Sequence, residues 1–185
     1  MKDITGNMVT LRPAVLRDRR SVFEWLAHSD VTRQMLGAPH YPDNPPPTWD
    51  EFISDYTEQF FTDFNPELGR CFIIEVNGEA KGQISYNKVW IEEGIVELDI
   101  WLGAKRHTGK GFGSDALNTI CGFLFEEFGC TRFLIAPSRR NSRAIRAYSK
   151  AGFLETKVIP SWFVPDYSDS IVLIKELHPD RISGF

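Results

Sequence analysis

The sequence predicts one domain of mixed α/β class, with antiparallel hairpins in its first part and alternating strands and helices in its second. The Asn77-Gly78 dipeptide separates two strand-like segments, at 70–76 and 80–90, and is typical of a β-hairpin. From residue 95 onward, strand-like and helix-like periodicities alternate. The chain of 185 residues is 42% hydrophobic, which is enough for one continuous core, so we expect residues 1–185 to form a single domain.

The first part of the chain contains four further elements. Residues 8–12 alternate as an opening strand, and the apolar residues of 15–28 have the spacing of an amphipathic helix. Three consecutive prolines in the segment 38–47 predict a surface loop, because proline lacks a backbone donor and restricts the residue before it. Residues 48–61 begin with a capping-box pattern, which predicts a helix to about Phe61.

The second part of the chain is built around the strand 95–102, whose two faces differ. Val96, Leu98, Ile100 and Leu102 share one face, and Glu97, Asp99 and Trp101 share the other. We expect the first face to pack in the core and the second to be available for chemistry. The elements that follow are a glycine-rich loop at 103–111, a helix at 112–128, a strand at 131–136, a helix at 141–151 that Gly152 ends, and strands near 153–159 and 169–176.

Composition excludes several classes of protein. No window of about 18 apolar residues and no apolar N-terminal segment is present, so we expect a cytoplasmic protein without a membrane span. Cys71, Cys121 and Cys130 lack CxxC spacing and lie beside large apolar residues, which predicts buried reduced thiols. The four histidines form no HxxxH or HExxH pattern, so we expect no metal site.

The net charge of −4 is unevenly distributed. The windows 105–110 and 139–150 hold eight of the 21 basic residues and no acidic residue, which leaves 13 basic residues to set against 25 acidic ones. A polyanion is expected to bind at the basic windows and a cation elsewhere, the alternative being that the windows are ordinary solvated helix faces.

A glycine-rich segment, Arg-His-Thr-Gly-Lys-Gly-Phe-Gly at 106–113, follows a strand and opens a helix. Backbone N–H groups at such a turn converge on an anion, and the glycines allow a phosphate to approach the backbone closely. The spacing fits neither a dinucleotide-binding GxGxxG fingerprint nor a P-loop. The segment therefore predicts a pyrophosphate site, and a plain glycine-rich turn is the alternative.

A second motif follows about 30 residues later. Asn141 and Tyr148 are seven residues apart, so on a helix they lie on one face about 10 Å from each other. The R-x-x-G-x-G segment at 106–111, together with N-S-R-A-I-R-A-Y-S-K-A-G-F at 141–153, resembles the two acetyl-CoA motifs of the GNAT superfamily of N-acetyltransferases. The resemblance covers residues 95–155 closely and the flanking elements loosely. It implies a GNAT-like α/β (α+β) fold, with a mixed, mostly antiparallel sheet splayed between two strands and helices on both faces.

The resemblance implies that acetyl-CoA is the co-substrate and that no metal takes part. In that family the pyrophosphate lies on backbone amides of the glycine loop, the pantetheine arm pairs with the preceding strand, and a residue like Asn141 holds the arm. A backbone N–H near Trp101 or Leu102 is placed to stabilise the thioester oxygen. The residues expected to bind acetyl-CoA are Ile100, Trp101, Leu102, Arg106, His107, Thr108, Gly109, Lys110, Gly111, Phe112, Gly113, Asn141 and Arg143.

Two residues are candidates for catalysis. Tyr148 resembles the family's general acid, and a tyrosine hydroxyl with a pKa near 10 can protonate a departing thiolate without being ionised at rest; a core aromatic is the alternative. The strand V-E-L-D-I-W-L resembles that of the aminoglycoside 6'-N-acetyltransferases, where an acidic residue at the position of Asp99 is the proposed base. Asp99 would need a raised pKa, a water relay or a purely electrostatic role, and an exposed strand carboxylate is the alternative.

The residues expected to contact the acceptor are Glu97, Asp99, Trp25 and Trp162. Trp25 belongs to a segment, F-E-W-L-A-H-S-D at 23–30, that also resembles the start of the aminoglycoside group, and Trp162 lies in a late connection. The triple-proline loop departs from that group.

The sequence therefore predicts an N-acetyltransferase whose acceptor is a cationic small-molecule amine, aminoglycoside-like or polyamine-like. One alternative acceptor is a peptide N-terminus, as in the ribosomal-protein acetyltransferases, and a second alternative is a non-catalytic CoA-binding module. We expect a monomer or homodimer with no membrane partner. No nucleic-acid partner is expected, because one cofactor accounts for the basic windows and they lack interleaved aromatic residues.

Overall fold

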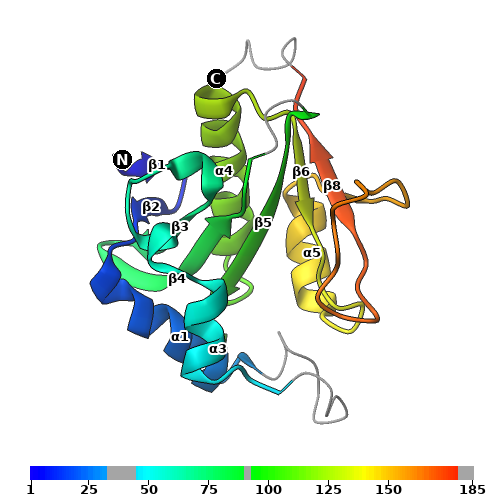
Figure 1. The fold of residues 1–185 in the computed structure, drawn as a ribbon. Coiled ribbons are helices and arrows are strands. Elements are labelled where there is room, and N and C mark those ends of the chain that lie inside the picture. The colour runs from blue at the N-terminus through cyan, green and yellow to red at the C-terminus, as the bar shows by residue number, and fades with distance from the viewer. Residues whose placement is uncertain (33–44, 90–92, 179–185) are drawn as a thin grey trace.

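The computed structural model describes residues 1–32, 45–89 and 93–178. Within these ranges an eight-stranded sheet forms the centre of the molecule, in the order β1-β2-β3-β4-β5-β6-β8-β7 (Figure 1). Neighbouring strands are antiparallel except β5 and β6, which run parallel. The strands are β1 (Ile4–Thr5), β2 (Thr10–Pro13), β3 (Arg70–Val76), β4 (Glu79–Tyr86), β5 (Ile95–Leu102), β6 (Arg132–Ile135), β7 (Leu154–Glu155) and β8 (Leu173–Glu176).

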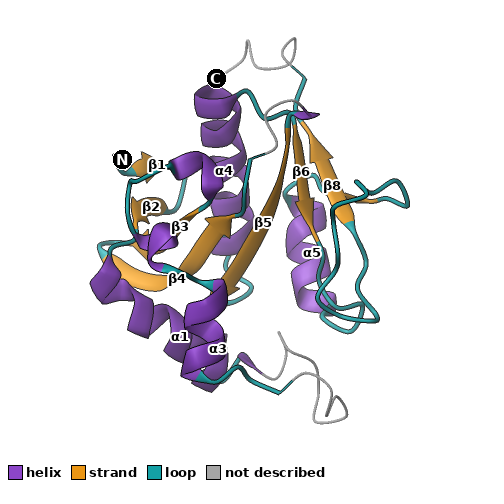
Figure 2. Ribbon diagram, in the orientation of Figure 1, coloured by secondary structure: helices purple, strands orange, loops and turns teal. Residues whose placement is uncertain are grey.

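Helices cover both faces of the sheet (Figure 2). The α-helices are α1 (Arg19–His28), α3 (Trp49–Asp55), α4 (Phe112–Phe128) and α5 (Ser142–Lys150). Helices α4 and α5 bury side chains in the larger core cluster with β2 to β6, and α1 and α3 pack in a second cluster on the other face. This arrangement confirms the predicted fold class. No helix among the described residues is long and apolar enough to span a membrane.

The β3–β4 hairpin forms where the sequence predicts it. Asn77 and Gly78 have φ angles of 52° and 76°, and a turn with two positive φ angles matches the twist of the flanking strands. Val76 pairs with Glu79 across the turn. Strand β4 ends at Tyr86, short of the predicted residue 90, and Trp90 lies outside the described residues.

Helix α3 begins at the predicted capping box. The Glu51 N–H donates to Thr48 Oγ1 at 3.3 Å, and the Thr48 N–H donates to Glu51 Oε2 at 2.8 Å. The helix ends at Asp55, and a separate 3-10 turn, Glu58–Phe61, follows, so the prediction of one helix to Phe61 was wrong. Of the predicted proline loop, residues 45–47 have no regular structure and residues 38–44 lie outside the described ranges.

The sheet splays between β5 and β6, as predicted. Ile95, Val96 and Glu97 pair with Arg132, Phe133 and Leu134, and the pairing stops there. From Leu98 to Leu102, β5 pairs with β4 along its other edge only. The backbone polar groups on the β6 side of this stretch are therefore open to a ligand.

The end of the chain departs from the prediction in length. Gly152 has a φ of 88° after α5 and ends the helix as expected. Strand β7 has two residues, where a strand near 153–159 was predicted, and β8 begins at Leu173 instead of near 169. The connection between them carries side chains that cover one face of the sheet. Cys71, Cys121 and Cys130 are buried and free, which confirms the predicted reduced thiols.

Asp115, in the first turn of α4, fixes this helix to the N-terminal segment. It is 8% exposed and accepts hydrogen bonds from the backbone amides of Met8 at 2.7 Å, Val9 at 3.0 Å and Asn7 at 3.2 Å. The carboxylate satisfies the buried Val9 amide, which would otherwise have no partner, and adds hydrogen bonds to the two more exposed amides before it. The start of α4, and with it the preceding glycine loop, is held in place by this contact.

We expect Asp115→Ala to lower the free energy of unfolding by about 1–3 kcal/mol, because it removes three hydrogen bonds to a carboxylate and leaves the buried Val9 amide unsatisfied. Urea denaturation measures the change. Glu126→Ala, an exposed change on the same helix, is the matched control and should shift the value by less than about 0.5 kcal/mol. Equal effects of the two substitutions would contradict the anchoring role.

Candidate active site

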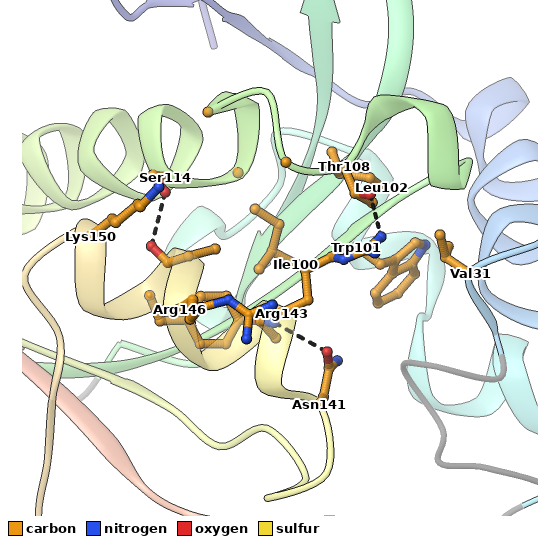
Figure 3. A pocket seen from close by; sticks show the side chains of 16 residues that line it. Val31, Ile100, Trp101, Leu102, Thr108, Ser114, Asn141, Arg143, Arg146 and Lys150 are labelled. Carbon is orange, nitrogen blue, oxygen red and sulfur yellow. Dashed lines mark hydrogen bonds between the residues drawn. The ribbon is translucent and has the colours of Figure 1, made fainter.

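Two cavities meet at β5. The first, which we call the β5–α5 cavity, has a volume of about 270 Å³ and lies between β5, the glycine loop and α5 (Figure 3). The second, which we call the acidic cavity, has a volume of about 730 Å³ and lies between α3, β5 and the connection that precedes β8. Both are lined by Ile100, Trp101, Asn141 and Tyr148. The two cavities therefore adjoin each other at these four residues.

The glycine loop leaves its backbone open to the β5–α5 cavity. Gly109 has a φ of 74°, and a Cβ built on it would have no atom within 4 Å. Gly111 has a φ of 93° and forms the N-cap of α4, so the unpaired N–H groups of the first turn follow it directly. An oxyanion at this position gains both the N–H donors and the positive end of the helix dipole.

Helix α5 supplies the opposite wall of the β5–α5 cavity. Asn141 caps it by accepting a hydrogen bond from the Ala144 N–H at 3.1 Å. Arg143 Nη1 donates to Thr108 Oγ1 at 2.5 Å and links α5 to the glycine loop. Figure 3 shows the side chains of α5 facing Ile100 and Trp101 of β5 across the cavity. Among the described residues, the charged side chains of its lining are Arg143, Arg146 and Lys150 and none is acidic, so the cavity suits a phosphate-rich ligand.

Most residues predicted to bind acetyl-CoA line this cavity. They are Ile100, Trp101, Leu102, Thr108, Gly109, Gly111, Gly113, Asn141 and Arg143. Four others do not: Arg106 and Lys110 are exposed on the loop, His107 Nδ1 lies 3.2 Å from the Lys81 carbonyl oxygen, and Phe112 packs against the core. Their side chains point away because the loop presents its backbone to the cavity.

Arg146 and Lys150 were not predicted as site residues. They follow Arg143 at helical spacing, three and seven residues on, so the same helix periodicity that joined Asn141 to Tyr148 was a sufficient signal to find them.

The acidic cavity carries the opposite charge. Its ionisable lining residues, apart from three tyrosines, are five carboxylates: Glu51, Asp55, Glu97, Asp99 and Asp166. No Lys, Arg or His side chain lines the described part of this cavity. The cavity therefore attracts cations and excludes anions.

Asp99 lies in the acidic cavity, held by a chain of hydroxyl groups. Tyr56 Oη donates to Asp99 Oδ2 at 2.9 Å and lies 3.0 Å from Ser85 Oγ. Burial raises the pKa of Asp99 to about 6, and repulsion from Asp166 acts in the same direction. Of the three possibilities predicted for Asp99, namely a raised pKa, a water relay or a purely electrostatic role, this shift is consistent with the first.

Glu97 lies two residues before Asp99 on the same face of β5. Asn87 Nδ2 donates to its Oε2 at 2.7 Å. Burial raises the pKa of Glu97 to about 7, although the bond from Asn87 opposes the shift, and repulsion from Asp99 adds to it. Both carboxylates of this face therefore have pKa values raised toward neutral pH.

Tyr148 lies at the junction of the two cavities. It is 8% exposed, and its hydroxyl has no hydrogen-bond partner among the described residues. Burial raises the pKa of Tyr148 well above its ordinary value, and the negative charge of Asp99 adds to the effect. The hydroxyl is therefore protonated at neutral pH and is available as a donor.

Trp25 and Trp162 do not line either cavity, which corrects two predictions. The Trp25 ring packs on Gly103, where an added Cβ would lie 2.6 Å from it. Trp162 packs beside Phe163, and its Nε1 lies 3.5 Å from Glu93 Oε2. The predicted segments still reach the acidic cavity through other residues, namely Leu26, Val164, Asp166 and Tyr167.

Sequence reasoning missed Tyr56, Ser85 and Asn87. The last two had a signal, because Gln83, Ser85 and Asn87 alternate with apolar residues on β4, and Ser85 pairs directly with Asp99. The sequence carries no signal for Tyr56, because its position beside Asp99 depends on how α3 packs.

The fold and site define an N-acetyltransferase that uses acyl-CoA. Residues 8–154 match the family described as the acetyltransferase (GNAT) domain, and the chain belongs to this family. It is 30% identical over 160 residues to the aminoglycoside N(6')-acetyltransferase type 1 of Klebsiella pneumoniae, which covers 80% of this chain and 75% of that protein.

Solved structures agree with this assignment. The aminoglycoside acetyltransferase AAC(6')-Ib in complex with coenzyme A has a TM-score of 0.67 and 25% identity, over 91% of this chain and 94% of that one. The ribosomal L7/L12 alpha-N-protein acetyltransferase RimL, in complex with coenzyme A, has a TM-score of 0.71 and 16% identity, over 95% and 98% of the two chains, and shares the fold.

Acetyl-CoA is the co-substrate of this enzyme, and the residues present fit it. The open glycine loop and the basic wall of α5 suit the pyrophosphate and phosphate groups, and the unpaired edge of β5 suits an amide-bearing arm. Among the described residues, no group of three or more His, Cys, Asp or Glu side chains is arranged for a metal ion.

We expect Gly109→Ala to raise the KM for acetyl-CoA about tenfold. The substitution strains a backbone with positive φ by about 1 kcal/mol and adds a methyl group where the pyrophosphate approaches. Steady-state kinetics at saturating amine measure the change. Gly122→Ala, in the open middle of α4, is the control and should leave this KM unaltered while stabilising the fold. An unchanged KM in Gly109→Ala would exclude the loop from cofactor binding.

Proposed function

We propose that this enzyme acetylates a primary amine of a small molecule that carries more than one positive charge, aminoglycoside-like or polyamine-like. The observation that carries the proposal is the acidic cavity, where five carboxylates and no cationic side chain surround the described space next to Tyr148. A single ammonium group would leave most of these carboxylates without a partner. The similarity to the Klebsiella pneumoniae enzyme, whose name gives aminoglycosides as substrates, supports the same class.

Asp99 is the proposed base. The acceptor amine is an ammonium ion at neutral pH and must lose a proton before it can attack. With a pKa of about 6, Asp99 is mostly ionised at pH 7 and is more basic than an ordinary carboxylate. Glu97 lies on the same face of β5 and provides a second negative charge that attracts the ammonium group.

Tyr148 is the proposed acid. Acetyl-CoA supplies the acetyl group as a thioester, and the departing sulfur needs a hydrogen-bond donor or a proton. The Tyr148 hydroxyl faces the junction of the two cavities and remains protonated, so it is placed to donate there. On the open edge of β5, a backbone N–H near Trp101 or Leu102 is placed to stabilise the carbonyl oxygen as negative charge develops.

Thiol release from acetyl-CoA, measured over a panel of amines, tests the proposal. The panel contains an aminoglycoside, a polyamine, a monoamine and peptides with free N-termini. Turnover that is highest on the polycations and falls with Tyr148→Phe supports it. Turnover on peptides alone would favour the N-terminal acetyltransferase, and binding of acetyl-CoA without any turnover would favour a binding module.

We expect the double variant Asp55→Asn, Asp166→Asn to raise the KM for a polycationic acceptor about tenfold, because two of the five carboxylates lose their charge. The KM for acetyl-CoA should stay constant, since both residues lie outside the β5–α5 cavity. Asp50→Asn, an exposed change on α3 outside the lining, is the matched control. The proposal loses its support if the double variant and the control bind the polycation equally well.

We expect kcat/KM to fall about tenfold per pH unit as the pH drops below 6, and to begin falling near pH 7. The pKa values of Asp99 and Glu97 are raised to about 6 and about 7, so both carboxylates become protonated in this range. A protonated carboxyl group can neither accept the proton of the amine nor attract a cation. A pH–rate profile locates this acid limb. Asp99→Asn should remove the fall centred near pH 6 and leave only the weaker fall near pH 7 that Glu97 causes, whereas a limb near pH 4 would show an unperturbed carboxylate.

A further inference from the structure

Tyr56 connects α3 to the centre of the acidic cavity through one defined hydrogen-bond chain. Its hydroxyl carries a single proton, which it donates to Asp99 Oδ2 at 2.9 Å. The contact of 3.0 Å with Ser85 Oγ must then be a bond that Ser85 donates and Tyr56 accepts. The chain therefore runs from Ser85 through Tyr56 to the carboxylate, and each bond polarises the next.

Both members of this chain are held rigidly. Ser85 is fully buried on β4 and stands directly opposite Asp99 in the sheet register. Tyr56 follows the last residue of α3, where Arg19 Nε donates to its carbonyl oxygen at 2.9 Å. Its ring is stacked on Phe52 with centroids 5.1 Å apart and planes at 4°. The hydroxyl is therefore placed by the backbone, by stacking and by the neighbouring strand.

Only one oxygen of Asp99 is taken up by this chain. No other side chain of the described residues donates a hydrogen bond to this carboxylate. Tyr56 occupies Oδ2, and a backbone hydrogen bond from Ile100 also reaches this carboxylate, so its remaining acceptor capacity is left for the amine in the cavity. The bond also prevents the carboxylate from rotating to form another contact.

We infer that Tyr56 and Ser85 are positioning residues that hold the Asp99 carboxylate in one orientation for proton transfer from the acceptor amine. This inference rests on the proposed role of Asp99. It assigns a role in the reaction to Tyr56, which directly follows α3 outside both acetyl-CoA motifs, and to Ser85 of β4, which pairs with Asp99.

Several other titratable groups surround Asp99 and contribute to its pH dependence. They are Glu97 on β5, Cys71 on β3, Tyr148 on α5, and Asp166 and Tyr167 from the connection before β8. None of them is cationic. The hydrogen bond from the Tyr56 side chain and, to a smaller extent, that from the Ile100 backbone favour the ionised form of Asp99 and lower its pKa.

The test is Tyr56→Phe, which removes the hydroxyl and keeps the stacked ring. The pKa of Asp99 and the acid limb of the pH–rate profile should both rise by about one unit. The pKa shift alone should lower turnover about fivefold at pH 6, and turnover should stay below the wild-type value above pH 8, where Asp99 is ionised in both proteins but is no longer held in one orientation, with the KM for acetyl-CoA unchanged. The Asp99 pKa is measured directly by carbon-detected NMR of the side-chain carboxyl, assigned by its loss in Asp99→Asn.

Tyr86→Phe is the matched control. Tyr86 follows Ser85 on β4, is equally buried, and its hydroxyl has no partner among the described residues because it points into the opposite core. Its removal should leave the acid limb in place. Ser85→Ala should produce a smaller shift than Tyr56→Phe, and no further shift when added to it, because Ser85 acts through Tyr56.

The outcomes separate this inference from the proposed function. An Asp99 pKa that is unchanged in Tyr56→Phe overturns the inference, whatever the acceptor is. A shift in the Asp99 pKa without a shift in the acid limb shows that Asp99 is not the base, and both the proposed role of Asp99 and the inference then fail. A parallel shift of both, absent from Tyr86→Phe, supports the positioning role.

Discussion

The arrangement of the two cavities depends on the point at which β5 and β6 separate, which lies after Glu97. Up to that residue the two strands satisfy each other's backbone groups, and beyond it the edge of β5 is open within a cavity. Unpaired backbone groups that are shielded from water cost free energy, so this edge favours a ligand that offers amide donors and acceptors of its own. The β5–α5 cavity, the junction at Tyr148 and the reach of the acidic cavity all follow from this one departure from regular pairing.

The same strand also separates a basic environment from an acidic one. The open glycine loop and the basic residues of α5 line the side where an anion binds. Glu97 and Asp99 project to the side where a cation binds, because side chains alternate along a strand. At Ile100 and Trp101 the two environments are adjacent. This arrangement suits an anionic donor and the cationic acceptor that we propose, because each then lies in a cavity of opposite charge and their reacting groups meet at β5.

Local signals in the sequence were sufficient for the parts of the fold that depend on local physics. The Asn77-Gly78 turn, the capping box of α3 and the bounds of α4 were predicted because neighbouring residues determine them. The break after Asp55 was not, because tertiary contacts such as that of Arg19 with Tyr56 decide where α3 ends. The same division holds at the site: the β5–α5 cavity comes from two continuous motifs, whereas the acidic cavity combines residues as far apart as Tyr56, Asp99 and Asp166.

The buried carboxylates of the acidic cavity lower the stability of the folded state at neutral pH before any acceptor binds. The raised pKa of Asp99 means that the folded state prefers its protonated form, so this preference favours folding fully at pH values below the ordinary pKa of 3.8 and is lost as the pH rises through about 6. At neutral pH the ionised group therefore opposes folding by an amount on the order of 2 kcal/mol, and Glu97 acts in the same sense. The polycation that we propose as the acceptor would offset this cost, because it brings positive charge to the desolvated carboxylates. The charge that weakens the empty site is thus the charge that selects the acceptor, and it leaves a carboxylate basic enough to take the proton of the amine.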